Sequence, residues 1–235
     1  MYRDHPLFER LHQATRLARR RFECRVEGYC RNFDLSKYRR LLQVCWGFYQ
    51  PLERKLVVLA DHVLLSSFVQ QRRKGPLLEQ DLLSLGMTRA DIAALPLCGP
   101  LPALPALAQG FGVMYATDGS AWGDRIATSY LAENKLGISS SRGASFFFSL
   151  RSSHDSLVNN ICWQDVVATT AAVEGPGVEE LAIQSALDTF ECFERWLAHQ
   201  ERSLCANSMR ANLRWSSVWE PELFCAERFG DIRVA

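Results

Sequence analysis

The chain of 235 residues has no apolar run of about 18 residues, the length at which a helix can cross the apolar part of a bilayer. Its first ten residues lack the apolar core of a secretory signal peptide. The formal net charge is only +1, so composition gives no electrostatic basis for binding nucleic acid or an anionic membrane. We therefore expect neither nucleic acid nor a membrane as a partner.

The sequence motifs of several common enzyme classes are also missing. There is no Walker phosphate-binding loop, no G-x-S-x-G motif, no H-E-x-x-H motif and no cysteine spacing typical of zinc sites. Only five histidines occur, and the two E-x-x-H motifs of a di-iron site in a helical bundle are not evident, because the spacing occurs once, at Glu9 and His12. These absences argue against zinc and di-iron chemistry, and we predict no metal ligands among the protein side chains.

The eight cysteines are scattered and form no C-x-x-C pair. In a chain of this length, such cysteines are typical of reduced, buried residues in a cytosolic protein, and a disulfide framework is the alternative. We therefore expect a cytoplasmic protein. The cysteines stand at positions 24, 30, 45, 98, 162, 192, 205 and 225.

What the sequence does contain is helical periodicity. Strand-like alternation is nearly absent, and 48% hydrophobic residues are enough for one core in a chain of this length. We predict an all-α, single-domain bundle of about seven to nine helices. The longer predicted helices cover residues 6–25, 35–53, 76–85, 110–136, 163–173 and 178–202.

Local signals mark several helix boundaries. Asp34 is a candidate N-cap, and Pro51 is expected to kink its helix because apolar periodicity resumes after it. Gly86 is a helix stop signal, and Thr88 is expected to cap the next short helix. Residues 96–105 contain four prolines and a glycine, which exclude regular helix and indicate an ordered crossing.

The last residues of the chain form a segment of their own. We predict a helical domain over residues 1–202 and a C-terminal extension over residues 203–235, packed on the domain or at an interface such as that of a homodimer. The extension is too aromatic for a typical disordered tail. Its large aromatic residues include Trp215, Trp219, Phe224 and Phe229.

The predicted helix over residues 110–136 is interrupted by Gly110, Gly112, Gly119 and Gly123. Each glycine inside a helix costs about 1 kcal/mol relative to alanine. Gly119 and Gly123 are four residues apart, so they leave one face of the helix bare. Two interpretations remain open: another helix packs closely on this face, or a flat ligand lies on it.

The middle of this helix resembles the distal helix of bacterial heme oxygenases, in particular those associated with bacteriophytochromes. The family form is Y-x-x-E-G-S-x-x-G-x-R, and the chain has Tyr115-x-x-Asp118-Gly119-Ser120-x-x-Gly123-Asp124-Arg125. Further segments match family motifs in order, so that the resemblance covers roughly residues 7–200. They are Leu11-x-x-Ala14-Thr15, Phe48-Tyr49-x-Pro51-Leu52-Glu53, Arg73-Lys74-x-Pro76-x-Leu78-Glu79-x-Asp81-Leu82-x-x-Leu85-Gly86, Gly143-Ala144-x-Phe146-Phe147 and Thr189-Phe190-x-x-Phe193-x-x-Trp196-Leu197.

The resemblance implies a fold, a cofactor and a reaction. Heme oxygenases open heme to biliverdin, iron and carbon monoxide, using oxygen and electrons from a ferredoxin or another reductant, and heme is both cofactor and substrate. By this resemblance the candidate catalytic residues are Asp118, Gly119 and Gly123, with Asp124 as a second carboxylate that could order distal water. The candidate heme-binding residues are Arg19, Tyr115, Gly119, Ser120 and Gly123.

One departure from the family lies at its most important position. The first helix of the family runs L-x-x-A-T-x-x-x-H, and its histidine is the proximal iron ligand; counting from Ala14-Thr15, this position is Arg19. Arginine has no lone pair for a metal, but it pairs well with carboxylates such as tetrapyrrole propionates. His12 lies about 10 Å further back along the helix axis, and Cys24 points to a different face, so both are poor substitute ligands.

We therefore expect a heme oxygenase-like protein that handles heme or a related tetrapyrrole and is degenerate as an oxygenase. An active heme oxygenase with a non-standard iron ligand is the first alternative. The second is a small-molecule or regulatory binding module that uses the same fold without heme.

Overall fold

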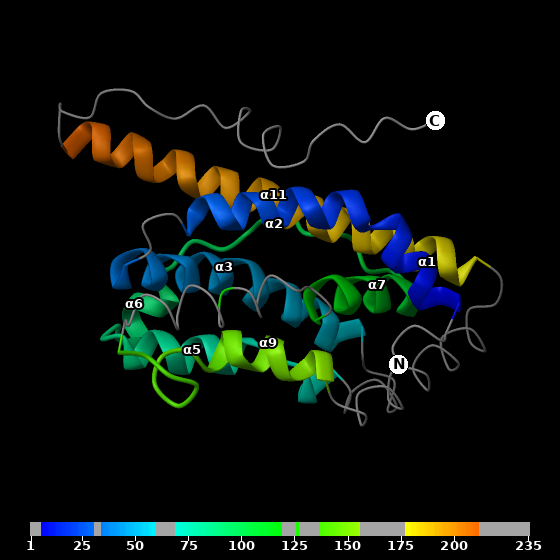
Figure 1. The fold of residues 1–235 in the computed structure, drawn as a ribbon, viewed down its shortest axis with the longest axis horizontal. Helices are drawn as coiled ribbons and strands as arrows, with labels where there is room; N and C mark the ends of the chain where they lie inside the picture. Colours follow the sequence, from blue (N-terminus) through cyan, green and yellow to red (C-terminus); the bar gives the residue numbers. More distant parts are fainter. Residues whose placement is uncertain are drawn as a thin grey trace. The chain divides into compact units, whose positions relative to one another are not determined.

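The computed structural model describes residues 6–30, 34–59, 69–118, 126, 137–155 and 177–211. These segments hold eight helices and no strand, which confirms the predicted all-α bundle of about seven to nine helices. No helix within them is both long and apolar enough to cross a membrane. The helices are α1 (Pro6–Ala14), α2 (Arg16–Tyr29), α3 (Leu35–Leu59), α5 (Gly75–Ser84), α6 (Arg89–Ala93), α7 (Leu107–Asp118), α9 (Ser145–Asp155) and α11 (Val178–Ala211) (Figure 1).

The chain divides into two compact units, Met1–Leu197 and Ala198–Ala235. The described part of the second unit is the last stretch of α11, up to residue 211. Most of the predicted C-terminal extension, and the helix predicted over residues 163–173, lie outside the described residues.

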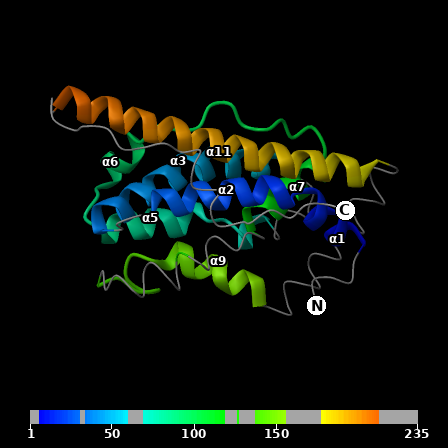
Figure 2. The ribbon, with the colours of Figure 1, turned by 45° about the horizontal axis from the view of Figure 1, so that its top comes forward.

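Within the first unit, α3 lies between two pairs of helices. One pair is α2 and α11, which run side by side and are joined by ion pairs. The other pair is α5 and α9, which pack on one another (Figures 1 and 2). Helix α7 also packs on α3 and α9. This arrangement places α7 and α2, the two helices that carry the candidate site, within reach of one another.

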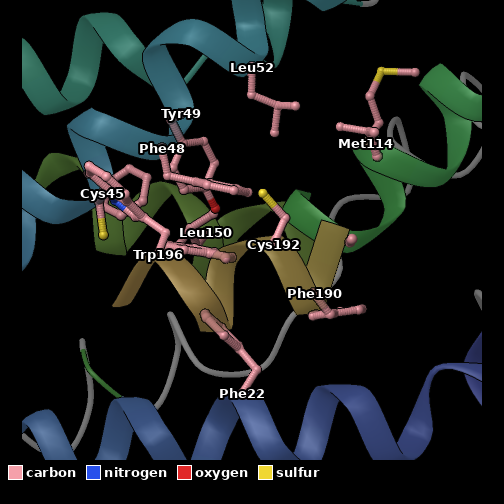
Figure 3. Close-up of a cluster of buried hydrophobic side chains, with 14 of the residues drawn as sticks. Phe22, Cys45, Phe48, Tyr49, Leu52, Met114, Leu150, Phe190, Cys192 and Trp196 are labelled. Carbon is pink, nitrogen blue, oxygen red and sulfur yellow. The ribbon is translucent and has the colours of Figure 1, made fainter. Parts of the chain in front are cut away.

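Aromatic side chains from α2, α3 and α11 form the centre of the core (Figure 3). The rings of Phe48 and Phe193 stack with their centroids 4.0 Å apart and their planes 3° from parallel. Phe22 of α2 approaches Phe193 with a centroid distance of 4.8 Å. The indole nitrogen of Trp196 is satisfied, because it donates a 2.9 Å hydrogen bond to the carbonyl of Val44. Helix α11 is thereby fixed against both α2 and α3.

Most of the predicted helix boundaries are confirmed. The carboxylate of Asp34 accepts the backbone N–H of Lys37 at 2.8 Å, and Pro51 lies inside α3, which continues to Leu59. Gly86 follows α5 with a φ of 87°, a left-handed conformation that glycine adopts without strain. Thr88 and Asp91 form a reciprocal capping box at the start of α6. Residues 96–105 contain no helix.

The prediction of one helix over residues 6–25 is wrong, because the helix breaks at Thr15 and its second part ends at Tyr29. The hydroxyl of Thr15 donates to the carbonyl of Leu11 at 2.7 Å, which is also the acceptor of Thr15's own N–H. Side-chain hydrogen bonds of this kind bend helices, and here the N–H of Arg19 still donates to the carbonyl of Thr15 at 2.9 Å. The apolar face of the segment continues through the break, and so periodicity alone does not reveal it.

A buried carboxylate holds α9 onto α5. Asp81 is 0% exposed, and its oxygens accept hydrogen bonds from the backbone N–H groups of Ser145 at 2.9 Å and Phe146 at 2.8 Å, and from the Ser145 hydroxyl at 2.8 Å. These are donors that a helix leaves unpaired in its first turn. Burial raises the pKa of Asp81, and the same hydrogen bonds oppose that rise. Asp81 therefore acts as an N-cap supplied from a distant helix.

Candidate functional site

The two glycines in the first half of α7 lie against neighbouring helices. A Cβ on Gly112 would overlap the carbonyl oxygen of Ala182 on α11, and a Cβ on Gly110 would overlap the Cδ2 of Leu59 on α3. The clash at Gly112 is with backbone, which cannot move aside, whereas the end of the Leu59 side chain can shift. Close helix packing thus accounts for Gly112, while the face of Gly119 and Gly123, to which the two interpretations apply, lies outside the described residues.

The predicted site residues divide into two groups. Arg19 on α2 and Tyr115 on α7 are described with their side chains. Asp118 is the last residue of α7, and its side chain lies outside the description. Gly119, Ser120, Gly123 and Asp124 also lie outside the described residues. The geometry of the candidate site is therefore that of its first two members and their neighbours.

Arg19 reaches back along its helix to His12. Its guanidinium nitrogens lie 3.1 Å from Nδ1 and 3.3 Å from Nε2 of the imidazole. From the seven-residue separation alone, we expected His12 to lie about 10 Å from Arg19 along the helix axis. The side chains nevertheless meet, because side chains on a helix tilt toward its N-terminus and arginine is long. The His12 ring is exposed to solvent, so this end of the cluster is open.

Tyr115 connects this cluster to α7. Its phenol oxygen is hydrogen-bonded to the side chains of Thr15 and Arg19, and the residue is only 9% exposed. Burial raises the pKa of Tyr115, while its side-chain hydrogen bonds with Thr15 and Arg19 and the charge of Arg19 oppose that rise. The phenol consequently stays neutral near pH 7. Arg19 thus bridges an exposed imidazole on α1 and a buried phenol on α7.

Other arginines of α2 have partners on α11 instead. Arg21 lies 3.5 Å and Arg25 3.9 Å from the carboxylate of Glu194. At the N-terminal end, Arg10 of α1 pairs with both Glu179 and Glu180. Within the described residues, the side chain of Arg19 contacts the imidazole of His12 and the phenol of Tyr115 and forms no ion pair with a carboxylate. Its positive charge is therefore still available to an anionic group that displaces one of them.

The side chain at position 19 does not fit the role of an iron ligand. A guanidinium offers only N–H donors, and here they are directed at His12 and Tyr115. The described residues also contain no group of three or more His, Cys, Asp or Glu side chains that could hold a metal ion. The same guanidinium does fit a carboxylate, which accepts two parallel hydrogen bonds from it.

A second polar cluster lies on the opposite side of α7, around a small cavity between α3 and the start of α5. The cavity has a volume of about 20 Å³, room for one water molecule, and its lining includes Glu53, Lys74 and Thr117. The carboxylate of Glu53 accepts the backbone N–H groups of Lys74 and Gly75, and it lies 3.6 Å from Arg73. Burial raises the pKa of Glu53, and these partners oppose the rise.

The site thus combines two predicted residues with two that the sequence did not assign to it, His12 and Thr15. Thr15 stands four residues before Arg19, a spacing that places both residues on one helix face. This spacing could have indicated that Thr15 belongs to the same site as Arg19.

No protein-family model matches the chain, and comparison with curated proteins gives no match. What the structure defines is an all-α bundle with a polar cluster between α2 and α7. Membership of the heme oxygenase-like family stays a prediction that rests on the order and spacing of the motifs.

Proposed function

We propose that this protein binds heme or a related tetrapyrrole on a heme oxygenase-like scaffold and does not open the ring. In this proposal Arg19 holds a carboxylate of the ligand in place of ligating its iron. The single observation that carries the proposal is the contact between Arg19 and Tyr115, which joins the two helices between which the resemblance puts the ligand.

The replacement of the Tyr115 phenol by a ligand group as the acceptor for Arg19 favours a carboxylate ligand. A flat ligand lying between α2 and α7 would separate Arg19 from Tyr115. The guanidinium would lose a neutral phenol as acceptor and gain a charged carboxylate, and charge-assisted hydrogen bonds are about twice as strong as neutral ones. Tyr115, a neutral phenol, can then donate its proton to the same ligand or to Thr15. The bridge seen in the free protein is therefore one that an anion can replace.

A titration with hemin, followed by absorbance, tests the proposal on the wild type, on Arg19→His and on Arg16→His. The wild type is expected to give a saturable one-to-one Soret band and no biliverdin absorbance when ascorbate or reduced ferredoxin is added. Arg19→His is expected to acquire turnover. Arg16→His adds a histidine at an exposed position one turn away and should behave as the wild type. The absence of saturable binding in all three proteins would overturn the proposal and leave the non-heme alternative.

His12 supports a second candidate, an active heme oxygenase with a non-standard iron ligand. Its ring nitrogens lie close to position 19 and are exposed at the edge of the cluster. Biliverdin formation by the wild type, lost in His12→Ala and kept in Arg16→His, would establish this candidate in place of the first.

A further inference from the structure

Two buried cysteines from distant parts of the sequence meet where the irregular segment 96–105 crosses α11. The Sγ atoms of Cys98 and Cys192 are 3.9 Å apart, although 94 residues separate them in the chain. Each residue is 3% exposed, and neither is in a disulfide. Figure 3 shows Cys192 projecting from α11 on the side that carries Trp196.

The backbone around this pair is fixed by several independent contacts. The N–H of Cys98 donates a 2.8 Å hydrogen bond to the carbonyl of Gly47 on α3. Position 47 must be a glycine, because a Cβ there would lie 2.5 Å from the carbonyl oxygen of Pro96 and 2.6 Å from the indole of Trp196. Trp196 follows Cys192 by one turn of α11. Both cysteines are therefore held at one junction of α3, the crossing segment and α11.

We propose that Cys98 and Cys192 are a redox-active pair that hydrogen peroxide oxidises to a reversible disulfide. This proposal is independent of heme binding. It rests on the two sulfur atoms at one junction, on the fixed backbone on both sides and on the charged groups around Cys192. The oxidised form ties the crossing segment, which leads directly into α7, to the middle of α11.

Cys192 is the nucleophile of the pair. The net pKa of the Cys192 thiol is lowered: hydrogen bonding from Cys98 lowers it most, burial opposes this, the positive charges of Arg195 and Lys55 lower it further, and the charge of Asp188 raises it. In the reduced pair the Cys192 thiol also donates a 3.0 Å hydrogen bond to the carbonyl of Pro100, which the thiolate gives up. The pKa of Cys98 is raised, first by its hydrogen bond to Cys192 and then by burial. Since the thiolate is the reactive form, Cys192 reacts first and Cys98 resolves the product.

The two steps balance as follows. The Cys192 thiolate attacks one oxygen of the peroxide, the O–O bond breaks, and the leaving hydroxide takes the proton that Cys192 has lost; this gives a sulfenic acid and one water. The sulfur of Cys98 then attacks that of Cys192, forming the S–S bond and releasing hydroxide, which takes the proton of Cys98 as a second water. Two thiols are oxidised and one peroxide is reduced to two waters.

The geometry requires only a small movement. The sulfur atoms must approach from 3.9 Å to about 2.0 Å, which side-chain rotation and a slight shift of the crossing segment can supply. The residues on either side of Cys98, Leu97 and Gly99, are exposed. A single surface segment thus separates the pair from solvent, and peroxide is small enough to reach it during brief local opening.

Counting thiols in the native full-length protein tests the proposal directly. Treatment with hydrogen peroxide, followed by denaturation and alkylation, is expected to lower the number of free thiols by two, and dithiothreitol should restore both. Peptide mapping should find the lost pair as a peptide that links Cys98 to Cys192. An unchanged number of free thiols, or a first disulfide between other cysteines, would overturn the proposal.

Variants assign the roles within the pair. Cys98→Ser and Cys192→Ser are each expected to abolish the cross-link, whereas the control Cys24→Ser, at a partly exposed position, should keep it. Dimedone should label the sulfenic acid on Cys192 in Cys98→Ser about tenfold more than that on Cys98 in Cys192→Ser. Equal labelling would contradict the assignment of Cys192 as nucleophile. The wild-type experiment remains decisive if either variant fails to fold.

Discussion

Two of the polar clusters that connect helices in this protein, those around Asp81 and Arg19, are built in opposite ways. Around Asp81, one buried carboxylate satisfies backbone N–H groups at the start of α9, and every atom of it is shielded from water. Around Arg19, side chains bond to one another between α2 and α7, and His12 at one end is exposed. The first cluster completes the fold. The second has partners that a ligand can replace, and this difference is what marks it as the candidate site.

The largest effect is expected at the buried cluster. Asp81→Ala removes the acceptor of two backbone N–H groups and one hydroxyl, leaving buried donors unpaired. The free energy of unfolding, measured by urea titration with far-UV circular dichroism, should fall by about 3 kcal/mol. Asp91→Ala removes an exposed capping carboxylate at α6 and serves as the control, with a much smaller loss. Equal losses in both variants would mean that Asp81 is no more than an ordinary surface cap.

The next effect concerns the packed half of α7. Gly112→Ala places a methyl group against the backbone of α11 and should lower the free energy of unfolding by about 2 kcal/mol through overpacking. Gly99→Ala is the matched control, because no atom lies within 4 Å of the added methyl, and its effect should stay within about 0.5 kcal/mol. If Gly112→Ala were as stable as the control, α7 and α11 would not be in contact as described.

Removing a buried hydroxyl beside the start of α9 and one from the Arg19 cluster extends the comparison. Tyr38→Phe leaves the buried carbonyl of Gly143 without its 2.7 Å hydrogen bond and should lower the free energy of unfolding by about 1.5 kcal/mol. Tyr115→Phe frees the partly exposed Arg19, which can turn to water, and should lower it by less than about 1 kcal/mol. The same Tyr115→Phe change should strengthen hemin binding, because Arg19 no longer has to leave the phenol. A weaker affinity would indicate that the phenol itself binds the ligand.

The smallest effect is a dependence on pH. The raised pKa of Glu53 means that the folded state holds this proton more tightly than the unfolded state, so stability falls as pH rises from the ordinary value of 4.5 through the raised one. Glu53→Gln lacks this titration. Its urea midpoint, followed from about pH 4 to pH 7, should therefore fall less with rising pH than that of the wild type. Parallel curves would show that Glu53 titrates as it does in the unfolded chain.

Local signals in the sequence predicted much of the fold. Asp34, Gly86 and Thr88 act within a few residues of their own positions, so their roles as caps and stops could be inferred without knowledge of the tertiary structure. Pro51 inside α3 was also foreseeable, because the apolar pattern continues beyond it. The break at Thr15 was not, since the apolar pattern continues through it unchanged.

The candidate site was less accessible to sequence reasoning. Arg19 and Tyr115 were found through the motifs, but their contact depends on how α2 and α7 pack, which no local pattern encodes. The role of Asp81 likewise depends on Ser145, a residue 64 positions away. Cys98 and Cys192 were both expected to be buried thiols, and only the fold brings their sulfur atoms together.

The most direct test of the central claim is whether Arg19 and a ligand carboxylate act on one another. The dissociation constants of hemin and of hemin dimethyl ester, whose propionates are uncharged, can be measured with the wild type and with Arg19→Ala. We expect esterification to weaken binding to the wild type about tenfold and binding to Arg19→Ala less than about twofold. An equal loss in both proteins would contradict the account, because the carboxylate would then be recognised by some group other than Arg19.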